Sequence, residues 1–296
     1  MSEVHALTEK AMVMNLTIGL WQGYRLDKEA SRKVTEEAGA KADAARVNKH
    51  LISKDALAPV VTAASALRHH FYENTLPWRD NGDRLMTRKL YMKFIEEHEK
   101  LRTEFDDAVQ IFLQVDYPRA IEQAAFRMGD LFNPDDYPHA GELRFKFYAR
   151  LDIDALTTAN DFRVAIDQEH VDRVRASMEQ AAEQRLQQAM GDVWKRIGDA
   201  IGRFHDRMSN PDAKFQASTV DNVQDLIDLV PGLNVTDDPD IEAVRRMIQD
   251  KLGGADAVEI RKDPEHRAEL ADGAKEILDR MSGFMRAFGG DVREAA

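Results

Sequence analysis

The feature that most constrains the fold of this chain is a line of apolar residues that recurs at helical intervals between residues 171 and 208. Its ten steps cover 37 residues, a mean spacing of 3.7 residues, close to one turn of an α-helix. Because this spacing is nearer an 11-residue than a 7-residue repeat, it predicts a nearly straight helix rather than a left-handed coiled coil. We expect this helix over residues 168–208, with an apolar line of Val171, Val174, Met178, Ala182, Leu186, Ala189, Val193, Ile197, Ile201, Phe204 and Met208.

Helical spacing recurs along most of the rest of the chain. The fold class predicted is therefore mainly α, with long antiparallel helices, one inserted β-hairpin and a smaller C-terminal helical region. The domains expected are an elongated helical domain over 1–210, with the hairpin at about 142–167, and a helical region over 211–296. Further helices are expected at 3–18, 27–40, 55–73, 87–115, continuing to about 131, and then at 219–229, 239–252 and 265–288.

Between residues 143 and 166 the period changes from helical to alternating, which is typical of half-buried strands. Two runs, 143–154 and 162–166, predict an antiparallel hairpin with a loop near 157–160. Its polar face is basic and can contact phosphate or an acidic protein surface; a solvated face is the alternative interpretation. The candidate interaction residues on this face are Arg144, Lys146, Tyr148, Arg150 and Arg163. A two-stranded hairpin is marginally stable alone, so it needs helices beneath it or a strand from another chain.

The charge is acidic and uneven. The net charge is −12, which disfavours nucleic acid as a partner. As an example of the uneven distribution, residues 221–240 contain six aspartates and no Lys or Arg. Such a distribution fits contact between parts of one molecule or between protein partners.

Composition also limits the chemistry and the location of the protein. The absence of cysteine excludes disulfides, thiolate metal sites and cysteine nucleophiles, and it suits a reducing compartment. Neither a signal peptide nor a membrane-spanning apolar run is visible, so a cytoplasmic protein without membrane contact is expected.

Motifs for catalysis and cofactor binding are missing. We find neither phosphate-binding glycine signature, no HExxH or ExxH spacing and no GxSxG elbow. We therefore expect no catalytic residue, metal or cofactor. His98 lies on the apolar line of the helix at 87–115, where a buried, hydrogen-bonded histidine and a ligand or base are the two interpretations.

The last helix carries an apolar line with flexible methionines. Such a line can fill a groove on a partner or pack against the protein's own core. The candidate interaction residues here are Met281, Phe284, Met285 and Phe288.

Four short segments resemble a helical family of unknown function found in bacteriophages and bacteria. They are 20–24 (Leu-Trp-Gln-Gly-Tyr), 75–82 (Thr-Leu-Pro-Trp-Arg-Asp-Asn-Gly), 162–164 (Phe-Arg-Val) and 230–234 (Val-Pro-Gly-Leu-Asn). In that family the gene typically stands beside one for a MoxR-type AAA+ ATPase, similar to the cobaltochelatase small subunit, and sometimes beside one for a von Willebrand A-type protein. The resemblance implies an adaptor for an ATPase and carries no catalytic residues. Trp21, Pro77 and Trp78 would be positions that set the shape of turns.

The function expected is that of a non-enzymatic interaction or adaptor protein. It would be phage-encoded, located in the bacterial host cytoplasm, and either homo-oligomeric or bound to a MoxR-type AAA+ ATPase. The alternative is a nucleic-acid-associated protein that contacts DNA through the hairpin face and a basic patch at 68–93. A metal-dependent hydrolase is the third and least favoured reading.

Overall fold

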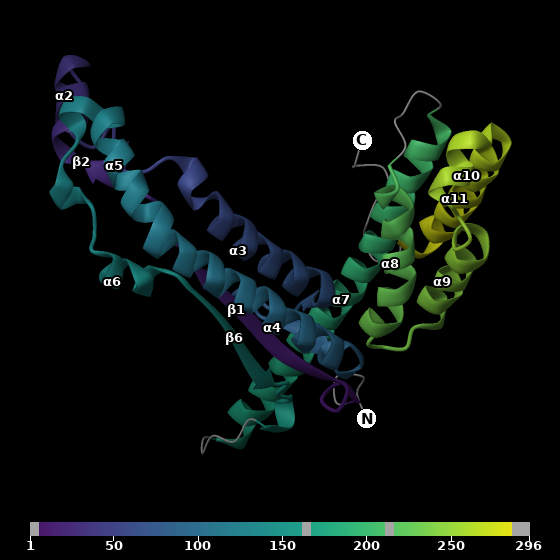
Figure 1. Ribbon diagram of the computed structural model, residues 1–296. Helices are drawn as coiled ribbons and strands as arrows, with labels where there is room; N and C mark the ends of the chain where they lie inside the picture. The colour runs from purple at the N-terminus through teal and green to yellow at the C-terminus, as the bar shows by residue number, and fades with distance from the viewer. Residues whose placement is uncertain (1–5, 162–166, 211–215, 286–296) are drawn as a thin grey trace. The chain divides into compact units, whose positions relative to one another are not determined.

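The computed structural model describes residues 6–161, 167–210 and 216–285, and it is mainly helical, as the sequence predicts (Figure 1). The chain forms two compact units that alternate along the sequence. Unit 1 comprises Met1–Asn15, Tyr72–Lys93 and Asp152–Ala296, and unit 2 comprises Leu16–Phe71 and Phe94–Leu151. This division differs from the boundary expected at residue 210, because helices on both sides of that residue pack together in unit 1.

Unit 1 is built around the long helix. Helix α7 (Gln168–Ser209) packs against α11 (Pro264–Met285) and against α8 (Ser218–Leu233), which runs back beside it (Figure 1). Helix α9 (Pro239–Leu252) contacts both α8 and α11, and the short α10 (Ala257–Lys262) precedes α11. The predicted apolar line of α7 is confirmed: its residues are buried except Val174 and Met178, which are half-buried. Among the helices described, none combines the length and apolar character needed to cross a lipid bilayer.

Helix α8 is longer than expected, because it continues through Pro231 to Leu233. The reason is a close contact with the start of α4 (Arg88–Ile111). The Thr87 hydroxyl donates to the Gly232 carbonyl at 2.7 Å, and a Cβ on Gly232 would overlap the Leu90 side chain. This contact satisfies a carbonyl in the last turn of the helix, where the helix itself supplies no partner.

The helix predicted at residues 3–18 is wrong. Much of that segment is strand β1 (Ala11–Gly19), which pairs antiparallel with β5 (Arg84–Thr87) from Ala11↔Thr87 to Met14↔Arg84. A short apolar run fits either a strand or a buried helix, so its period cannot decide between them. The pairing partner decides, and it lies about 70 residues away in the sequence.

The small sheet has the order β4-β5-β1-β6. Strand β4 (Leu76–Pro77) forms an antiparallel hairpin with β5, and Gly82 in the connecting turn has a φ of +93°. Strand β6 (Tyr148–Ala155) confirms the strand predicted in this region, but its neighbour in the sheet is β1. The predicted second strand of the hairpin, at 162–166, lies outside the described residues.

The first part of the predicted strand is helical instead. Residues 140–143 form α6 (Ala140–Leu143), and Arg144–Lys146 form the 3₁₀ turn η4. A 3₁₀ turn has three residues per turn, so the two-residue alternation is lost there. Phe145, expected on the buried face, is consequently 81% exposed.

The core of unit 2 lies between α3 (Lys54–Asn74), α4 and the buried residues on β6 and just before it. Between α4 and α5 (Tyr117–Met128), the chain forms one π-helical turn, η1 (Phe112–Asp116). The Trp21 ring lies edge-on to Tyr117 at 5.6 Å and tilted against Phe112 at 6.4 Å. Trp21 therefore packs its turn onto the core, in agreement with a shape-setting role.

Two arginines bind the carboxyl-terminal end of α3 within unit 1. Arg196 of α7 donates to the carbonyls of Glu73, Tyr72 and Thr75 at 2.6, 3.0 and 2.8 Å. Arg84 of β5 donates to the Thr75 carbonyl at 2.8 Å, and its burial, followed by the Arg196 charge, lowers its pKa. The last carbonyls of a helix lack internal partners and carry partial negative charge, so cations stabilise them.

Replacing Arg196 with Ala should lower the free energy of unfolding by about 2–4 kcal/mol, because several charge-assisted hydrogen bonds are lost at once. Denaturant unfolding followed by circular dichroism measures this change. Arg203→Ala is the matched control, since Arg203 lies exposed on the same helix. An effect no larger than that of the control would show that these contacts contribute little.

Candidate protein-interaction surface

A small two-stranded sheet in unit 2 separates a charged inner face from an exposed outer face. Strands β2 (Tyr24–Asp27) and β3 (Val47–His50) pair antiparallel, with Tyr24 opposite His50 and Leu26 opposite Asn48. Because side chains alternate between the faces of a strand, these four share one face, and all four are exposed. Arg25 and Lys49 lie on the other face.

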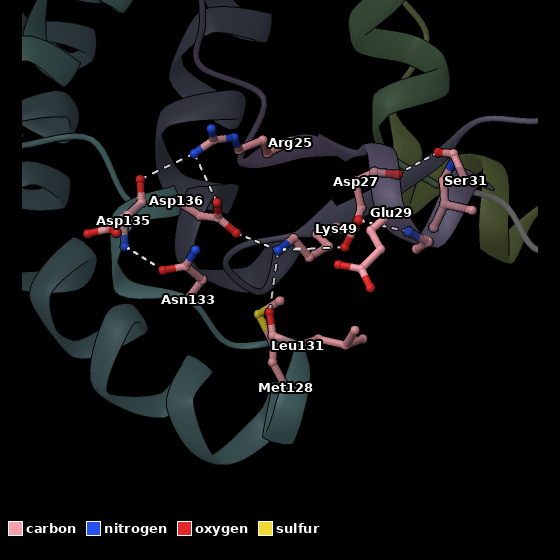
Figure 2. Close-up of polar contacts among 12 residues, drawn as sticks. Arg25, Asp27, Glu29, Ser31, Lys49, Met128, Leu131, Asn133, Asp135 and Asp136 are labelled. Carbon is pink, nitrogen blue, oxygen red and sulfur yellow. Dashed lines mark hydrogen bonds and ion pairs between the residues drawn. The ribbon is translucent and has the colours of Figure 1, made fainter. Parts of the chain in front are cut away.

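The inner face of this sheet is held by ion pairs to Asp136, which follows α5 in the 3₁₀ turn η3 (Pro134–Asp136). Arg25 Nη1 lies 2.9 Å from Asp136 Oδ1, and Lys49 Nζ lies 2.5 Å from Asp136 Oδ2. Figure 2 shows both side chains directed at the Asp136 carboxylate. Lys49 also lies 3.6 Å from Asp27. Asp136 is only 8% exposed, so its charge depends on these partners. We call Arg25, Asp27, Lys49 and Asp136 the charge cluster.

The electrostatics of the cluster favour its charged forms. The hydrogen bond to Asp136 is the largest cause that raises the pKa of Lys49, and the charges of Asp136 and Asp27 add to it. The backbone N–H of Ala30 is the largest cause that lowers the pKa of Asp27, which caps helix α2 (Lys28–Glu37). Both shifts favour the charged forms of Lys49 and Asp27.

Further hydrogen bonds join the end of α5 to β3. Arg127 Nη2 donates to the His50 carbonyl at 2.6 Å, and Lys49 Nζ lies 3.5 Å from the Leu131 carbonyl. In Figure 1, β2 and α5 lie at the same end of this unit. The sheet and α5 are thus held in one arrangement by side-chain contacts rather than by an extended sheet.

This end of unit 2 exposes several large apolar side chains. Phe126 on α5 is 96% exposed, and Leu131, just after α5, is 56% exposed. Tyr24 and Leu26 on the outer face of β2 are 47% and 42% exposed. We call Tyr24, Leu26, Phe126 and Leu131 the tip surface. Single exposed apolar residues are ordinary, and the four at this end of the unit are a candidate protein-interaction site.

The predicted hairpin-face residues do not all lie on one strand. Tyr148 and Arg150 lie exposed on β6, and the Tyr148 ring covers Gly19 so closely that no Cβ would fit there. Arg144 and Lys146 are exposed but belong to η4 and not to a strand. Arg163 lies outside the described residues. The expected single basic strand face is therefore a basic turn followed by a strand.

The predicted interaction face of the last helix is corrected at Met281. This side chain is fully buried in unit 1 and is not available to a partner. The side chains of Phe284 and Met285, and all of Phe288, lie outside the described part of the chain.

His98 is buried in an aromatic stack within unit 2. It is 2% exposed, and its ring stacks on Phe94 at 5.3 Å, while His70 stacks on Phe94 at 4.8 Å. The burial expected for His98 is confirmed, but its Nδ1 has no hydrogen-bond partner among the described residues. Burial, followed by the His70 charge, lowers the pKa of His98.

Among the residues that the structure describes, no three His, Asp or Glu side chains come together as metal ligands would. Comparisons with protein-family models, with curated proteins and with solved structures find no match to this chain. The resemblance of its short motifs to a phage and bacterial family therefore stays a prediction.

The tip surface was not identified from the sequence. Phe126 and Leu26 stand in segments of ordinary composition, and no periodic signal separates an exposed apolar residue from a buried one there. Helix α5 is the exception: the spacing of its buried residues Tyr117, Ala120 and Ala124 places Phe126 off the buried face.

Replacing Asp136 with Asn should lower the free energy of unfolding by about 2–4 kcal/mol, since Lys49 and Arg25 lose their shared carboxylate in a partly buried site. Denaturant unfolding measures the change. The adjacent Asp135→Asn, at an exposed position, is the control. Equal stability of both variants would contradict a structural role for the cluster.

His98 should make the fold less stable in mild acid. Its pKa is lower in the folded chain, so below about pH 6.5, the ordinary value, the unfolded chain takes up a proton that the folded chain does not. Stability is therefore retained above that pH and declines as the pH falls toward the folded pKa.

The test is the free energy of unfolding measured across this pH window. The decline should be shallower in His98→Phe than in the wild type. His170→Gln, which changes an exposed histidine, is the comparison variant. Parallel pH profiles for the wild type and His98→Phe would refute the argument.

Proposed function

We propose that this chain is a non-enzymatic interaction protein that serves as an adaptor for other proteins. The observation that carries this proposal is the tip surface, above all the 96% exposed side chain of Phe126. Aromatic side chains contribute strongly to binding when a partner buries them. A protein partner would remove this apolar area from water.

The charge cluster supports the same proposal because it limits the motion of the elements that carry the tip surface. Arg25 and Lys49 alternate along their strands with the exposed Tyr24, Leu26 and His50. Elements already held in place lose less conformational entropy on binding. A surface whose elements are fixed before binding suits a specific partner.

For the partner we propose a MoxR-type AAA+ ATPase, with self-association as a second mode of interaction. This choice rests on the resemblance of the motif segments. Of these segments, 20–24 and 230–234 pack closely on their neighbours, so they support a family fold and not a binding chemistry. Phage origin and a cytoplasmic location belong to the same proposal.

The double variant Phe126→Asp/Leu26→Asp should abolish binding to the ATPase, because charges then occupy the area that a partner would bury. Native mass spectrometry and a pull-down with a purified MoxR-type ATPase measure the loss. The control is Val61→Asp, an exposed apolar position on α3 of the same unit. It should bind as the wild type does.

Two results would count against the adaptor proposal. One is full binding by the double variant, which would remove the tip surface from the interaction. The other is a wild-type protein that binds neither the ATPase nor itself. Circular dichroism of each variant separates loss of binding from loss of folding.

A further inference from the structure

We propose that copies of this chain associate head to tail, with residues 144–150 of one copy bound to the acidic face of α8 in the next. This inference deepens the proposed function, since it rests on self-association and names the surfaces that would carry it. The two segments belong to different units and have opposite charge.

The first surface is the basic segment, residues 144–150. Arg144, Lys146 and Arg150 are exposed, and no acidic residue stands between them in the sequence. Two aromatic side chains accompany them: Phe145 is 81% exposed and Tyr148 is 48% exposed. Cationic and aromatic groups together are enriched in the centres of protein interfaces.

The second surface is the acidic face of α8. Asp221, Asp225 and Asp228 are all exposed, and their spacing of four and three residues places them on one side of the helix. The opposite side is buried in unit 1 through Val223, Leu226, Ile227 and Val230.

Like charges at these spacings repel one another, and the described residues supply no ion pair to relieve them. The hydrogen bond to Glu242 is the largest cause that raises the pKa of Arg245, and the charge of Asp228 also contributes. The Arg245 guanidinium is, however, already paired with the Glu242 carboxylate at 2.8 Å. A cationic surface from outside the molecule would therefore stabilise this face.

The charges of the two units favour a second copy over a nucleic acid as the occupant of the basic segment. Unit 1 has 25 Lys and Arg against 35 Asp and Glu, whereas unit 2 has 16 against 18. A phosphate chain would be repelled by a molecule with a net charge of −12. The acidic unit 1 of another copy offers complementary charge, and an acidic protein surface contributes its own apolar atoms for Phe145 to contact.

The two surfaces differ, so the contact between copies is heterologous. Each copy keeps one surface available after the other is occupied, and the association closes as a ring or continues as an open chain. This arrangement gives a test that an ordinary two-fold dimer would not pass.

The experiment uses two charge-reversal variants of the full chain. One carries Arg144→Glu, Lys146→Glu and Arg150→Glu, and the other carries Asp221→Lys, Asp225→Lys and Asp228→Lys. Each should raise the dissociation constant for self-association at least about tenfold, since opposed charges at an interface become like charges. Native mass spectrometry and analytical ultracentrifugation at about 50 mM and about 500 mM salt measure this, and the association should weaken at high salt.

Mixing the two variants is the decisive step. Each retains the surface that the other has lost, and the two reversed surfaces are again opposite in charge, so the mixture should form complexes larger than a dimer from two variants that are each monomeric alone. The control Lys41→Glu/Lys54→Glu/Arg119→Glu makes the same charge change at exposed positions of unit 2. It should associate as the wild type does.

Three outcomes would overturn the inference: a wild type that is monomeric at low salt, a mixture of variants that stays monomeric, or a control that dissociates as the basic-segment variant does. A fluorescent single-stranded oligonucleotide tests the other occupant. If the wild type binds it, the basic-segment variant does not, and the two proteins have the same oligomeric mass, the segment binds nucleic acid instead. If self-association fails while the Phe126→Asp/Leu26→Asp variant still loses the ATPase, only this inference fails and the adaptor proposal stands.

Discussion

The arginines at the end of α3 are the contact on which the arrangement of unit 1 depends. Arg196 and Arg84 come from α7 and β5, and both donate to carbonyls at or just beyond the last turn of α3. The last carbonyls of a helix carry partial negative charge, so the two guanidinium groups stabilise this end of α3. Three distant parts of the sequence are thereby joined at one point, and the long helix is positioned on the β4–β5 hairpin.

In unit 2, ion pairs hold a small sheet to the segment that follows α5. Strands β2 and β3 form a sheet of only two strands, which is marginally stable by itself. The inner face is therefore held to Asp136 by Arg25 and Lys49. The outer face carries Tyr24 and Leu26, so the same alternation that directs the charged side chains inward leaves these two apolar side chains exposed.

The candidate surfaces bring these structural facts together with the uneven charge of the chain. The tip surface exposes apolar groups on elements that are held in place, and the basic segment and the acidic face of α8 offer complementary charges. For these surfaces we propose contact with other proteins.

The long helices could be predicted from the sequence alone, because a long amphipathic repeat leaves one stable way to bury its apolar side. The bounds of α7 and α9 agree with the repeat, and the strand at 148–155 was visible as alternation. Only the tertiary structure decided which strands pair, since β1 gains its partner from a distant segment and its own apolar run fits either a helix or a strand. It also decided which side chains remain exposed: Phe126 and Phe145 point away from the core because of the helix face and the 3₁₀ turn that carry them. Burial depends on what packs on a residue, and that information lies elsewhere in the chain.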